Sequence, residues 1–362
     1  MTPSVFITGG GGFIGAHLAE RLVAKGQSVT IFDNFHPQLA GLNVENAARL
    51  KQHGVRVVEG DVCDRDAVGA ALSAARPDVV YHLAAETGTG QSYDHPARYA
   101  HVNVTGTAQL VEAMRTLSNP VERVILTSSR AVYGEGAYVD GSGAPSLPVP
   151  RTQKDMAAGD FDPKDVRGQR LTPVATNAQC PPRPASVYAS TKLMQEYLLS
   201  QTLTDSETEL GVLRLHNVYG PGQSLNNPYA GVLSLFARQI LDGKALEVFE
   251  DGHITRDFVF IDDVVTALER MGEIDVMPSD PIDIGTGRPS TILDVATELL
   301  RLMGRDDTSL TVTGAFRPGD IRHALADTSA AQDRLGWRAE HDLTTGLDRL
   351  IGWSQTHQTK TI

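Results

Sequence analysis

Residues 4–15 read SVFITGGGGFIG, in which a short apolar run meets four glycines and then the start of a helical pattern. This order predicts a strand, a tight turn and a helix. Gly9, Gly12 and Gly15 suit a turn with positive φ, a backbone that closely approaches a pyrophosphate, and a helix packed tightly on its strand. The amides at such a helix start can hold the phosphates of a dinucleotide. An ordinary glycine-rich turn fits the triplet equally well, so its context has to decide.

That context is a second apolar run at residues 28–32, which ends in Asp33. An acid at this point of a dinucleotide-binding unit accepts hydrogen bonds from both hydroxyls of the adenosine ribose. A carboxylate there also repels a 2′-phosphate. The sequence therefore predicts a dinucleotide site that prefers NAD to NADP.

The composition narrows the class of protein. The length of 362 residues allows two to three domains, and the formal net charge of −12 opposes binding to nucleic acid or to an anionic membrane surface. Two cysteines, Cys63 and Cys180, provide neither a disulfide framework nor a metal site. We find no apolar run long enough to span a membrane and no basic leader before the first strand. We expect a cytoplasmic enzyme.

Strand and helix patterns alternate along the first half of the chain. Apolar residues recur at four-residue spacing in the first helix, and buried strands are predicted at 55–58, 79–83 and 124–127. Helical patterns lie between these strands, at 64–75 and about 96–117. This alternation predicts the α/β class, with a Rossmann-type doubly wound parallel sheet.

Small or polar residues come after several of the predicted strands, where open α/β sheets form their ligand crevice. Asp61 can face an adenine amino group or cap a turn, and Ala84 and Ala85 leave room for a cofactor. Ser128 and Ser129 present two hydroxyls that can bind an alcohol or form an ordinary turn.

The pattern breaks between residues 135 and 185, which are rich in Gly, Pro, Asp and Lys and show little periodicity. We call this segment the excursion. Two interpretations remain open for it: a lid or edge wall over the substrate, and a disordered surface insertion.

A helix start comes next, with Tyr188 and Lys192 four residues apart on one face. A cation beside a phenol favours the phenolate and lowers its pKa, as would the positive nicotinamide ring of an oxidised cofactor. Such a pair can serve as a general base. An amphipathic surface pair has the same spacing, but the glycine turn and Ser129 favour the base.

These features together resemble the extended short-chain dehydrogenase/reductase enzymes that act on nucleotide sugars. The matching motifs occur in order along nearly the whole chain: Thr8-Gly9-x-x-Gly12-x-x-Gly15, His82-Leu83-Ala84-Ala85, Ser128-Ser129-x-x-Val132-Tyr133-Gly134, Tyr188-x-x-x-Lys192, Arg214-x-x-Asn217-Val218-Tyr219-Gly220-Pro221-Gly222, Arg256-Asp257-Phe258-Val259-x-x-Asp262-Asp263 and Arg317-Pro318-Gly319-Asp320.

The resemblance implies roles for individual residues. Tyr188 is the base, Lys192 binds the nicotinamide ribose and lowers the pKa of the base, and Ser129 binds the reacting hydroxyl. The implied substrate contacts are Thr87, Ser129, Asn217, Arg256, Arg317 and Asp320. The implied NAD contacts are Gly9, Gly12, Phe13, Ile14, Gly15, Asp33, Asn34, Asp61, Val62, Leu83, Ala84, Ala85, Asn103, Thr127, Tyr188 and Lys192.

The resemblance also implies the domain layout. The NAD-binding domain covers 1–216 and regains strands near 258–260 and 282–284. A smaller C-terminal α/β domain for the nucleotide sugar is built from 217–257 and 286–362, with helices at 231–242, 293–303 and 343–353. The helix patterns before residue 117 and after Tyr188 imply a homodimer.

The two residues directly after Ser129 narrow the reaction. The 4,6-dehydratases of this family carry Asp-Glu there, because proton transfers at two further carbons need an acid and a base. This chain has Arg130 and Ala131, which also disfavours a decarboxylase. A 4-epimerase or a 4-ketoreductase remains, and NAD favours the epimerase.

The loops at 86–92 and 222–229 resemble the branch of the family that epimerises dTDP-L-rhamnose to dTDP-6-deoxy-L-talose. A protein of another class, which senses dinucleotide without catalysis, stays open. The intact Ser129, Tyr188 and Lys192 argue against it, since a sensor needs no base.

Overall fold

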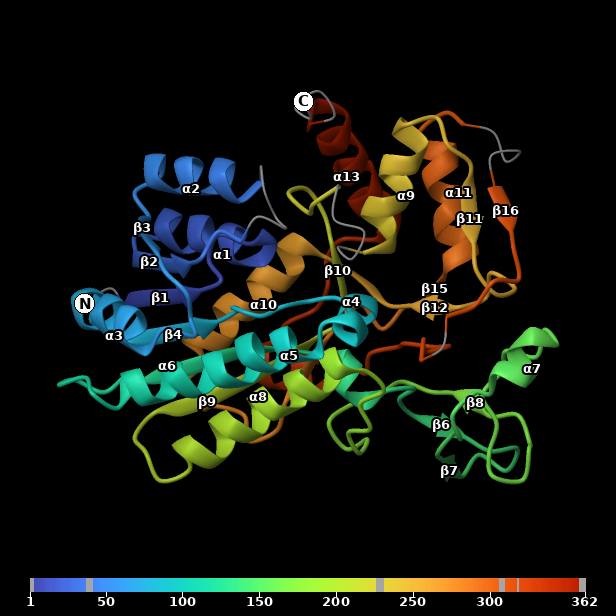
Figure 1. Cartoon of the computed structure of the whole chain (residues 1–362), viewed down its shortest axis with the longest axis horizontal. Helices are drawn as coiled ribbons and strands as arrows, with labels where there is room; N and C mark the ends of the chain where they lie inside the picture. The colour runs from blue at the N-terminus through green and yellow to red at the C-terminus, as the bar shows by residue number, and fades with distance from the viewer. Residues whose placement is uncertain (1–2, 37–41, 226–230, 306–309, 318, 358–362) are drawn as a thin grey trace.

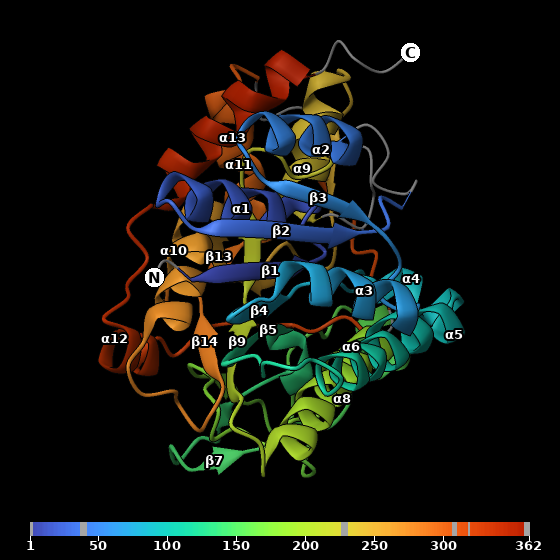
Figure 2. The same ribbon diagram turned by 90° about the vertical axis from the view of Figure 1, so that its left-hand side faces the viewer.

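The computed structural model describes residues 3–36, 42–225, 231–305, 310–317 and 319–357. Its centre is a seven-stranded, all-parallel sheet in the order β14-β9-β5-β4-β1-β2-β3 (Figures 1 and 2). The strands in chain order are β1 Ser4–Thr8, β2 Ser28–Asp33, β3 Arg56–Glu59, β4 Val79–His82, β5 Arg123–Ser129, β9 Glu209–Leu215 and β14 Ile282–Ile284. The predicted α/β class with a doubly wound parallel sheet is confirmed.

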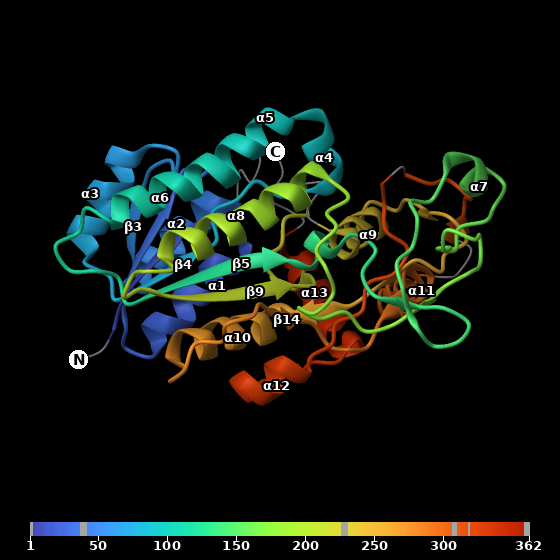
Figure 3. The same cartoon turned by 90° about the horizontal axis from the view of Figure 1, so that it is seen from below.

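Helices cover both faces of this sheet (Figure 3). One face carries α3 (Arg65–Ala75), α6 (Gly106–Met114) and α8 (Val187–Leu203), and the other carries α1 (Phe13–Ala24) and α10 (Ile261–Glu273). Helix α2 (Leu42–Gln52) lies beside α1 and β3. Strands buried on both faces explain why the sequence shows continuous apolar runs instead of alternation.

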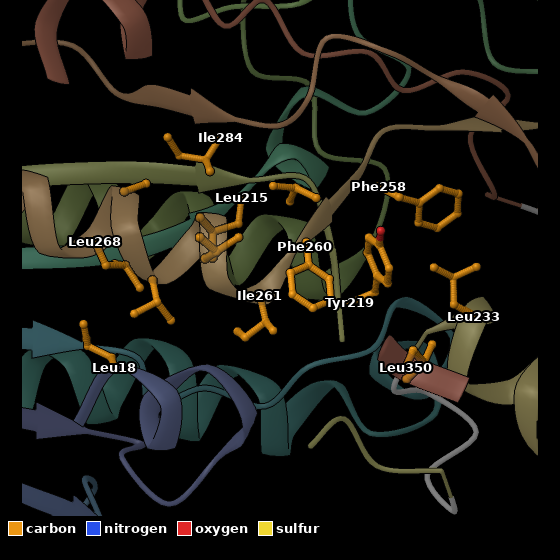
Figure 4. Packing of buried hydrophobic residues seen from close by; sticks show 14 of the residues in the cluster. Leu18, Leu215, Tyr219, Leu233, Phe258, Phe260, Ile261, Leu268, Ile284 and Leu350 are labelled. Atoms are coloured by element: carbon orange, nitrogen blue, oxygen red, sulfur yellow. The ribbon is translucent and has the colours of Figure 1, made fainter. Parts of the chain in front are cut away.

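Strand β1 divides its side chains between two hydrophobic clusters. Val5 and Ile7 point into a cluster with α1 and α10, whereas Phe6 points to the opposite face, toward α3 and α6. The first cluster extends from Leu18 through Phe260 and Tyr219 to Leu350, beyond the sheet (Figure 4). The N-terminal and C-terminal parts of the chain therefore share one continuous core.

The C-terminal part is a small α/β layer beside the carboxyl ends of the strands. It contains the pairs β11 (Leu246–Val248) with β16 (Leu310–Val312) and β12 (Thr255–Arg256) with β15 (Ser290–Thr291). Its helices are α9 (Val232–Leu241), α11 (Ile292–Leu302) and α13 (Leu343–His357), close to the predicted ranges. Helix α12 (Ser329–Leu335) lies near β14.

One strand predicted for the main sheet lies elsewhere. Strand β13 (Phe258–Phe260) pairs with β10 (Asn217–Tyr219) in a separate two-stranded sheet, while β14 joins the main sheet at its edge as predicted. The chain contacts the main sheet as far as His216, whose amide donates to Ile284 O (2.9 Å). The next amide, Asn217 N, donates to Asp257 O (2.9 Å), and β10 from there on pairs with β13.

The predicted helix at 96–117 is segmented. It runs as α5 (Pro96–Tyr99), a π-helical turn at Ala100–Thr105 and α6, and α4 (Thr89–Asp94) precedes it. The π-helical turn holds the fully buried Asn103, and such turns often occur at functional sites. No helix in the described part of the chain is long and apolar enough to cross a membrane.

The excursion at 135–185 is folded (Figure 1). Strand β6 (Tyr138–Val139) lies between β7 (Pro145–Ser146) and β8 (Thr172–Pro173), and a short helix α7 (Gln153–Ala157) comes after β7. Tyr138, Met156 and Phe161 within the excursion are buried. The interpretation of a disordered insertion is therefore wrong.

Candidate functional site

A cavity of about 560 Å³ opens at the carboxyl ends of the parallel strands and extends to the C-terminal layer. Most predicted site residues line it: Gly9, Gly12, Phe13, Ile14, Gly15, Asp33, Asn34, Val62, Leu83, Ala84, Ala85, Thr87, Thr127, Ser129, Tyr188, Lys192, Asn217, Arg256 and Asp320. Asp61, Asn103 and Arg317 do not. Residues from both predicted domains thus meet around one space.

The glycine turn forms the cradle expected for a dinucleotide. Gly9 has φ +69°, and a Cβ on it would lie 2.6 Å from the amide nitrogen of Ala84. A Cβ on Gly15 would lie 2.5 Å from the carbonyl oxygen of Gly9. Helix α1 begins after Gly12, which offers no side chain to cap it. The first amides of α1 therefore remain available for an anion, and these residues fit a cofactor diphosphate.

Asp33 is held at the end of β2 by two backbone amides. Its Oδ2 accepts from Gly11 N (2.9 Å) and its Oδ1 from Phe35 N (2.8 Å). Burial raises the pKa of Asp33, and the hydrogen bonds from Phe35 and Gly11 oppose this. The carboxyl group lines the cavity, where it can accept from sugar hydroxyls.

Asp61 has the geometry of a turn cap. Its Oδ1 accepts from the amide of Cys63 (2.8 Å), and its Oδ2 accepts from Asn34 Nδ2 (3.1 Å). It therefore lies behind Asn34, which does line the cavity. These contacts favour the role of a turn cap for Asp61 over a contact with the adenine amino group.

Tyr188 and Ser129 both line the cavity and lie next to each other. Ser186 caps helix α8 through its Oγ, which accepts from Ala189 N (3.1 Å), and so fixes where Tyr188 emerges. Burial raises the pKa of Tyr188, and a hydrogen bond with Ser129 opposes this. Lys192 lies one turn later, and burial lowers its pKa to about 7 despite the nearby Glu196.

Burial is the largest influence on the pKa values of both groups. It raises the pKa of Tyr188 and lowers that of Lys192, so it favours the neutral form of each. The effect of Lys192 on the pKa of Tyr188 stays a prediction. The protein's own contribution to a lower Tyr188 pKa is the hydrogen bond with Ser129. A cationic ring beside Tyr188 would add to it.

A buried polar network lies behind Lys192. Glu196 accepts from Arg214 Nη2 (2.6 Å) and Nε (3.0 Å), and Ser128 donates to the same carboxylate. Arg214 in turn lies over the ring of Tyr133, 4.7 Å from its centre. The network ties helix α8 to the end of strand β5, so it fixes Ser129 relative to Lys192.

Asn103 supports the cavity from behind. Its Oδ1 accepts from the amide of Glu86 (2.7 Å), and its Nδ2 donates to Thr191 Oγ1 (2.9 Å) and to Glu86 O (3.1 Å). These hydrogen bonds join the π-helical turn, the loop at Glu86 and helix α8. The contact of Asn103 with the cofactor stays a prediction.

The predicted substrate residues are only partly brought together. Arg256 Nη2 donates to Asp320 Oδ1 (2.9 Å), and both residues line the cavity together with Asn217 and Thr87. The guanidinium of Arg317 instead lies 4.7 Å from the centre of the Phe249 ring, outside the cavity lining.

Arg130 is a site residue whose side chain the sequence did not place. It lines the cavity and is buried, its Nη2 donates to Gly134 O (2.7 Å), and its Nε has no partner among the described residues. Burial and the nearby Arg256 lower its pKa to about 10, so it remains a cation at neutral pH. The signal in the sequence is a charged residue directly after Ser129. By sequence alone, it serves only to exclude a dehydratase, which carries an acid at that position.

The substrate loops inferred from resemblance lie partly at the cavity. Glu86, Thr87, Gly88 and Thr89 line it from the first loop, and Arg98 Nη2 donates to Glu86 Oε1 (2.6 Å). Gln223 and Ser224 line it from the second loop. Residues 226–229 of that loop lie outside the described residues.

The chain matches known sequences over nearly all of its length. Residues 6–141 match the model of GDP-mannose 4,6 dehydratase, and residues 166–285 match the NAD dependent epimerase/dehydratase family. The chain is 41% identical to dTDP-L-rhamnose 4-epimerase of Burkholderia thailandensis, over 96% of this chain and 94% of that protein. It belongs to the NAD-dependent nucleotide-sugar epimerase family. This confirms the resemblance drawn from the motifs.

Other members of this epimerase family agree in sequence and in structure. UDP-glucose 4-epimerase of Mycolicibacterium smegmatis is 31% identical over 95% of the chain and 96% of that protein. UDP-glucuronic acid 4-epimerase of Bacillus cereus, solved with UDP-glucuronic acid and NAD, has a TM-score of 0.80 at 26% identity and covers 98% of this chain and 99% of its own. UDP-glucose 4-epimerase of Thermotoga maritima gives 0.78 at 28% identity, with the same coverage.

Family membership settles the class and the cofactor. The epimerase uses NAD, in agreement with the glycine cradle and Asp33. Its relatives and structural neighbours are NAD-dependent nucleotide-sugar 4-epimerases. The alternative of a non-catalytic dinucleotide sensor is therefore wrong.

Proposed function

We propose that this epimerase inverts C4 of a dTDP-6-deoxy-L-hexose and interconverts dTDP-L-rhamnose and dTDP-6-deoxy-L-talose. The observation that carries the reaction type is the meeting of Tyr188, Ser129 and the glycine cradle at one cavity that holds Arg130 where a dehydratase needs an acid. The sugar and the nucleotide rest on the 41% identity to dTDP-L-rhamnose 4-epimerase and on the loop at 86–92.

The proposed roles depend on where each group lies. Tyr188 accepts the proton of the C4 hydroxyl, and Ser129 hydrogen-bonds the same oxygen, so the two share one proton path. When the inverted C4 hydroxyl forms, Tyr188 returns the proton. Bound NAD supplies a reversible hydride acceptor for C4. Because the hydride and the proton are both returned, substrate and product have the same composition.

Lys192 has two proposed tasks. It binds the nicotinamide ribose, and its charge stabilises the phenolate of Tyr188. Because burial lowers its pKa to about 7, its charge is easily lost, and Glu196 is the neighbour that favours the ammonium form. A ribose hydroxyl that accepts from this ammonium would raise the pKa again.

The diphosphate and nucleoside contacts are proposed for the part of the cavity that Arg256 and Asp320 line. Arg256 and Asp320 form a fixed pair there, and Asn217 and Thr87 offer neutral polar groups. Guanidinium groups bind phosphate oxygens with two parallel hydrogen bonds. Arg317 can join them only if its guanidinium leaves the ring of Phe249.

We also propose a cytoplasmic homodimer in which α6 and α8 pair with the same helices of a second copy. Helix α8 exposes Met194 and Tyr197 to solvent, as expected for an apolar face that a partner covers. Size-exclusion chromatography with light scattering checks this directly. A monomer at working concentration would contradict it.

The reaction is tested in D₂O with dTDP-L-rhamnose and no added NADH, followed by NMR. A 4-epimerase yields the C4 epimer without deuterium on any ring carbon, because the same hydride leaves and returns. Deuterium at C3 or C5 would instead show enolisation. A strict need for added NAD(P)H would show a ketoreductase, and a stable 4-keto-6-deoxy product from a 6-hydroxy sugar would show a dehydratase.

The substrate is tested by the same assay on UDP-, GDP- and CDP-sugars. Faster turnover of any of these than of the dTDP-sugar would overturn the proposed nucleotide. The reaction class would stand in that case, since the base and the cradle do not depend on the nucleotide.

A further inference from the structure

Residues 319–321 form a partition between two cavities. Asp320 and Ile321 line the main cavity and also a second cavity of about 430 Å³ on the other side. The far wall of this second cavity belongs to the excursion and includes residues 147–151 and Met156. A segment with open space on both sides has few packing contacts, so its polar contacts must hold it in place.

The polar contact from the excursion side comes from Arg151. Its Nη2 donates to the carbonyl oxygen of Asp320 (2.6 Å), and its side chain is only 5% exposed. From the opposite side, Arg256 Nη2 donates to Asp320 Oδ1 (2.9 Å) and to Ile321 O (3.0 Å). The partition is thus held between two guanidinium groups, and one of them lies in the main cavity.

Arg151 itself is fixed by a buried carboxylate. Its Nη1 donates to Glu250 Oε1 (2.7 Å), and Glu250 Oε2 accepts from Arg322 Nη1 (2.8 Å). Glu250 is 1% exposed, and Arg322 also pairs with Asp251 (2.7 Å). Because both guanidinium groups are paired with carboxylates, the network can remain charged while buried. Arg151 therefore has a well-defined position from which to hold Asp320.

The excursion is joined to the same stretch of chain at two further points. Glu135 Oε2 accepts from the amide of Arg322 (2.9 Å) at the start of the excursion. Near its end, Thr176 N donates to Leu325 O (2.9 Å). These contacts attach the excursion to the residues that come after the partition, as expected for a fixed support and not for a mobile lid.

We infer that the excursion is a fixed support behind the substrate site, and that Arg151 is the positioning residue through which it sets Asp320 and Arg256 for nucleotide-sugar binding. This inference rests on the proposed function in one respect, namely that Asp320 and Arg256 contact the nucleotide sugar. Arg151 lines only the second cavity, so it acts through its neighbours. Its loss should weaken substrate binding and leave the chemical step and NAD binding intact.

The test compares wild type with Arg151→Met, with the double variant Arg151→Met/Glu250→Gln, and with the control Arg167→Met on the exposed part of the excursion. The double variant removes one charge of each sign, so the buried network stays balanced while the bond to Asp320 is still missing. Readouts are KM and kcat of the NAD-loaded enzyme, the Kd of dTDP and of UDP by calorimetry, NAD content and Tm.

We expect Arg151→Met to raise KM and the Kd of the preferred nucleoside diphosphate about tenfold, with kcat changed by less than about twofold. The double variant should regain Tm and keep the KM defect, and the control should match wild type. The inference is overturned if KM recovers together with Tm, if kcat falls while KM stays, or if Arg151→Met changes neither KM nor Kd.

The calorimetry separates this inference from the proposed function. If wild type turns over no dTDP-sugar but binds UDP or dTDP, the proposed substrate fails and the Kd comparison still decides the role of Arg151. If wild type turns over the dTDP-sugar and Arg151→Met changes neither KM nor Kd, the proposed substrate stands and the inference fails.

Discussion

Lys192→Met should make the NAD-free enzyme more stable while it abolishes turnover. Lys192 is 3% exposed, and its pKa is lowered to about 7 because burial disfavours the ammonium form. Methionine has a similar length and no charge. Its introduction leaves no orphaned carboxylate, because Glu196 keeps its hydrogen bonds from Arg214 and Ser128. The substitution therefore removes the cost of the buried cation and little else.

The magnitude is set by the pKa of Lys192. An exposed lysine has a pKa of 10.5, and each tenfold change in proton affinity is worth about 1.4 kcal/mol, so the buried ammonium costs about 4 kcal/mol at about pH 7. The unfolded chain binds this proton below pH about 10.5 and the folded chain only below about 7. The free-energy cost of the buried ammonium is therefore absent above about pH 10.5, grows as the pH falls, and is constant below about pH 7. At about pH 9.5 it is about 1.5 kcal/mol.

Urea unfolding of the NAD-stripped protein, followed by circular dichroism at about pH 7 and about pH 9.5, measures these differences. Lys192→Met should gain several kcal/mol over wild type at the lower pH and clearly less at the higher pH. The control is Lys244→Met, because the side chain of Lys244 is 67% exposed and its substitution should change stability by less than about 0.5 kcal/mol. A variant no more stable than wild type at either pH would refute the reasoning, and an equal gain at both would assign it to packing.

The remaining predictions concern the base, the cofactor and the diphosphate contact. Tyr188→Phe should slow turnover, measured by NMR of the reaction, by about 10²- to 10⁴-fold and should leave the NAD content unchanged. Near-normal turnover at neutral pH would show that Tyr188 is not the base. Asp33→Ala should weaken the preference for NAD over NADP about tenfold or more, because a charged acceptor for the ribose hydroxyls is lost, and identification of the copurified dinucleotide checks this. Arg256→Ala should raise KM about tenfold or more, whereas Arg317→Ala, from its place on Phe249, should raise it less than about threefold. Equal effects of the two arginines would show that Arg317 enters the site with substrate.

The features that the sequence predicted well are set by residues close together in the chain. The turn at Gly9, Gly12 and Gly15 depends on local backbone conformation, since Gly9 has a φ of +69° and a Cβ at Gly15 would lie 2.5 Å from the carbonyl oxygen of Gly9. Asp33 is found at the end of its strand by simple counting, and Tyr188 and Lys192 share a face because one helical turn separates them. The parallel sheet was predicted from apolar strand patterns that alternate with helical patterns along the chain. Each strand pattern is a continuous apolar run because the strand is buried on both faces.

The tertiary structure decided features that depend on residues far apart. The hydrogen bonds of Asn103 with Glu86 and with Thr191, the latter 88 positions away, could not be predicted from its motif. Arg317 lies in a matching motif, but its guanidinium packs on the ring of Phe249. Strand β13 pairs with β10 and not with the main sheet. None of these could be read from local spacing, because hydrogen-bond and ring partners are chosen by the packing of the whole chain.

The excursion shows this division most clearly. Its Gly- and Pro-rich composition could not distinguish a wall from a disordered insertion, because composition reports local backbone freedom and not the contacts that remove it. Those contacts are made by Arg151 with Glu250 and with Asp320, 99 and 169 positions away. A sequence specifies local turns and helix faces through short-range sterics and periodicity, whereas the pairing of buried charges is fixed only once the core has brought distant segments together.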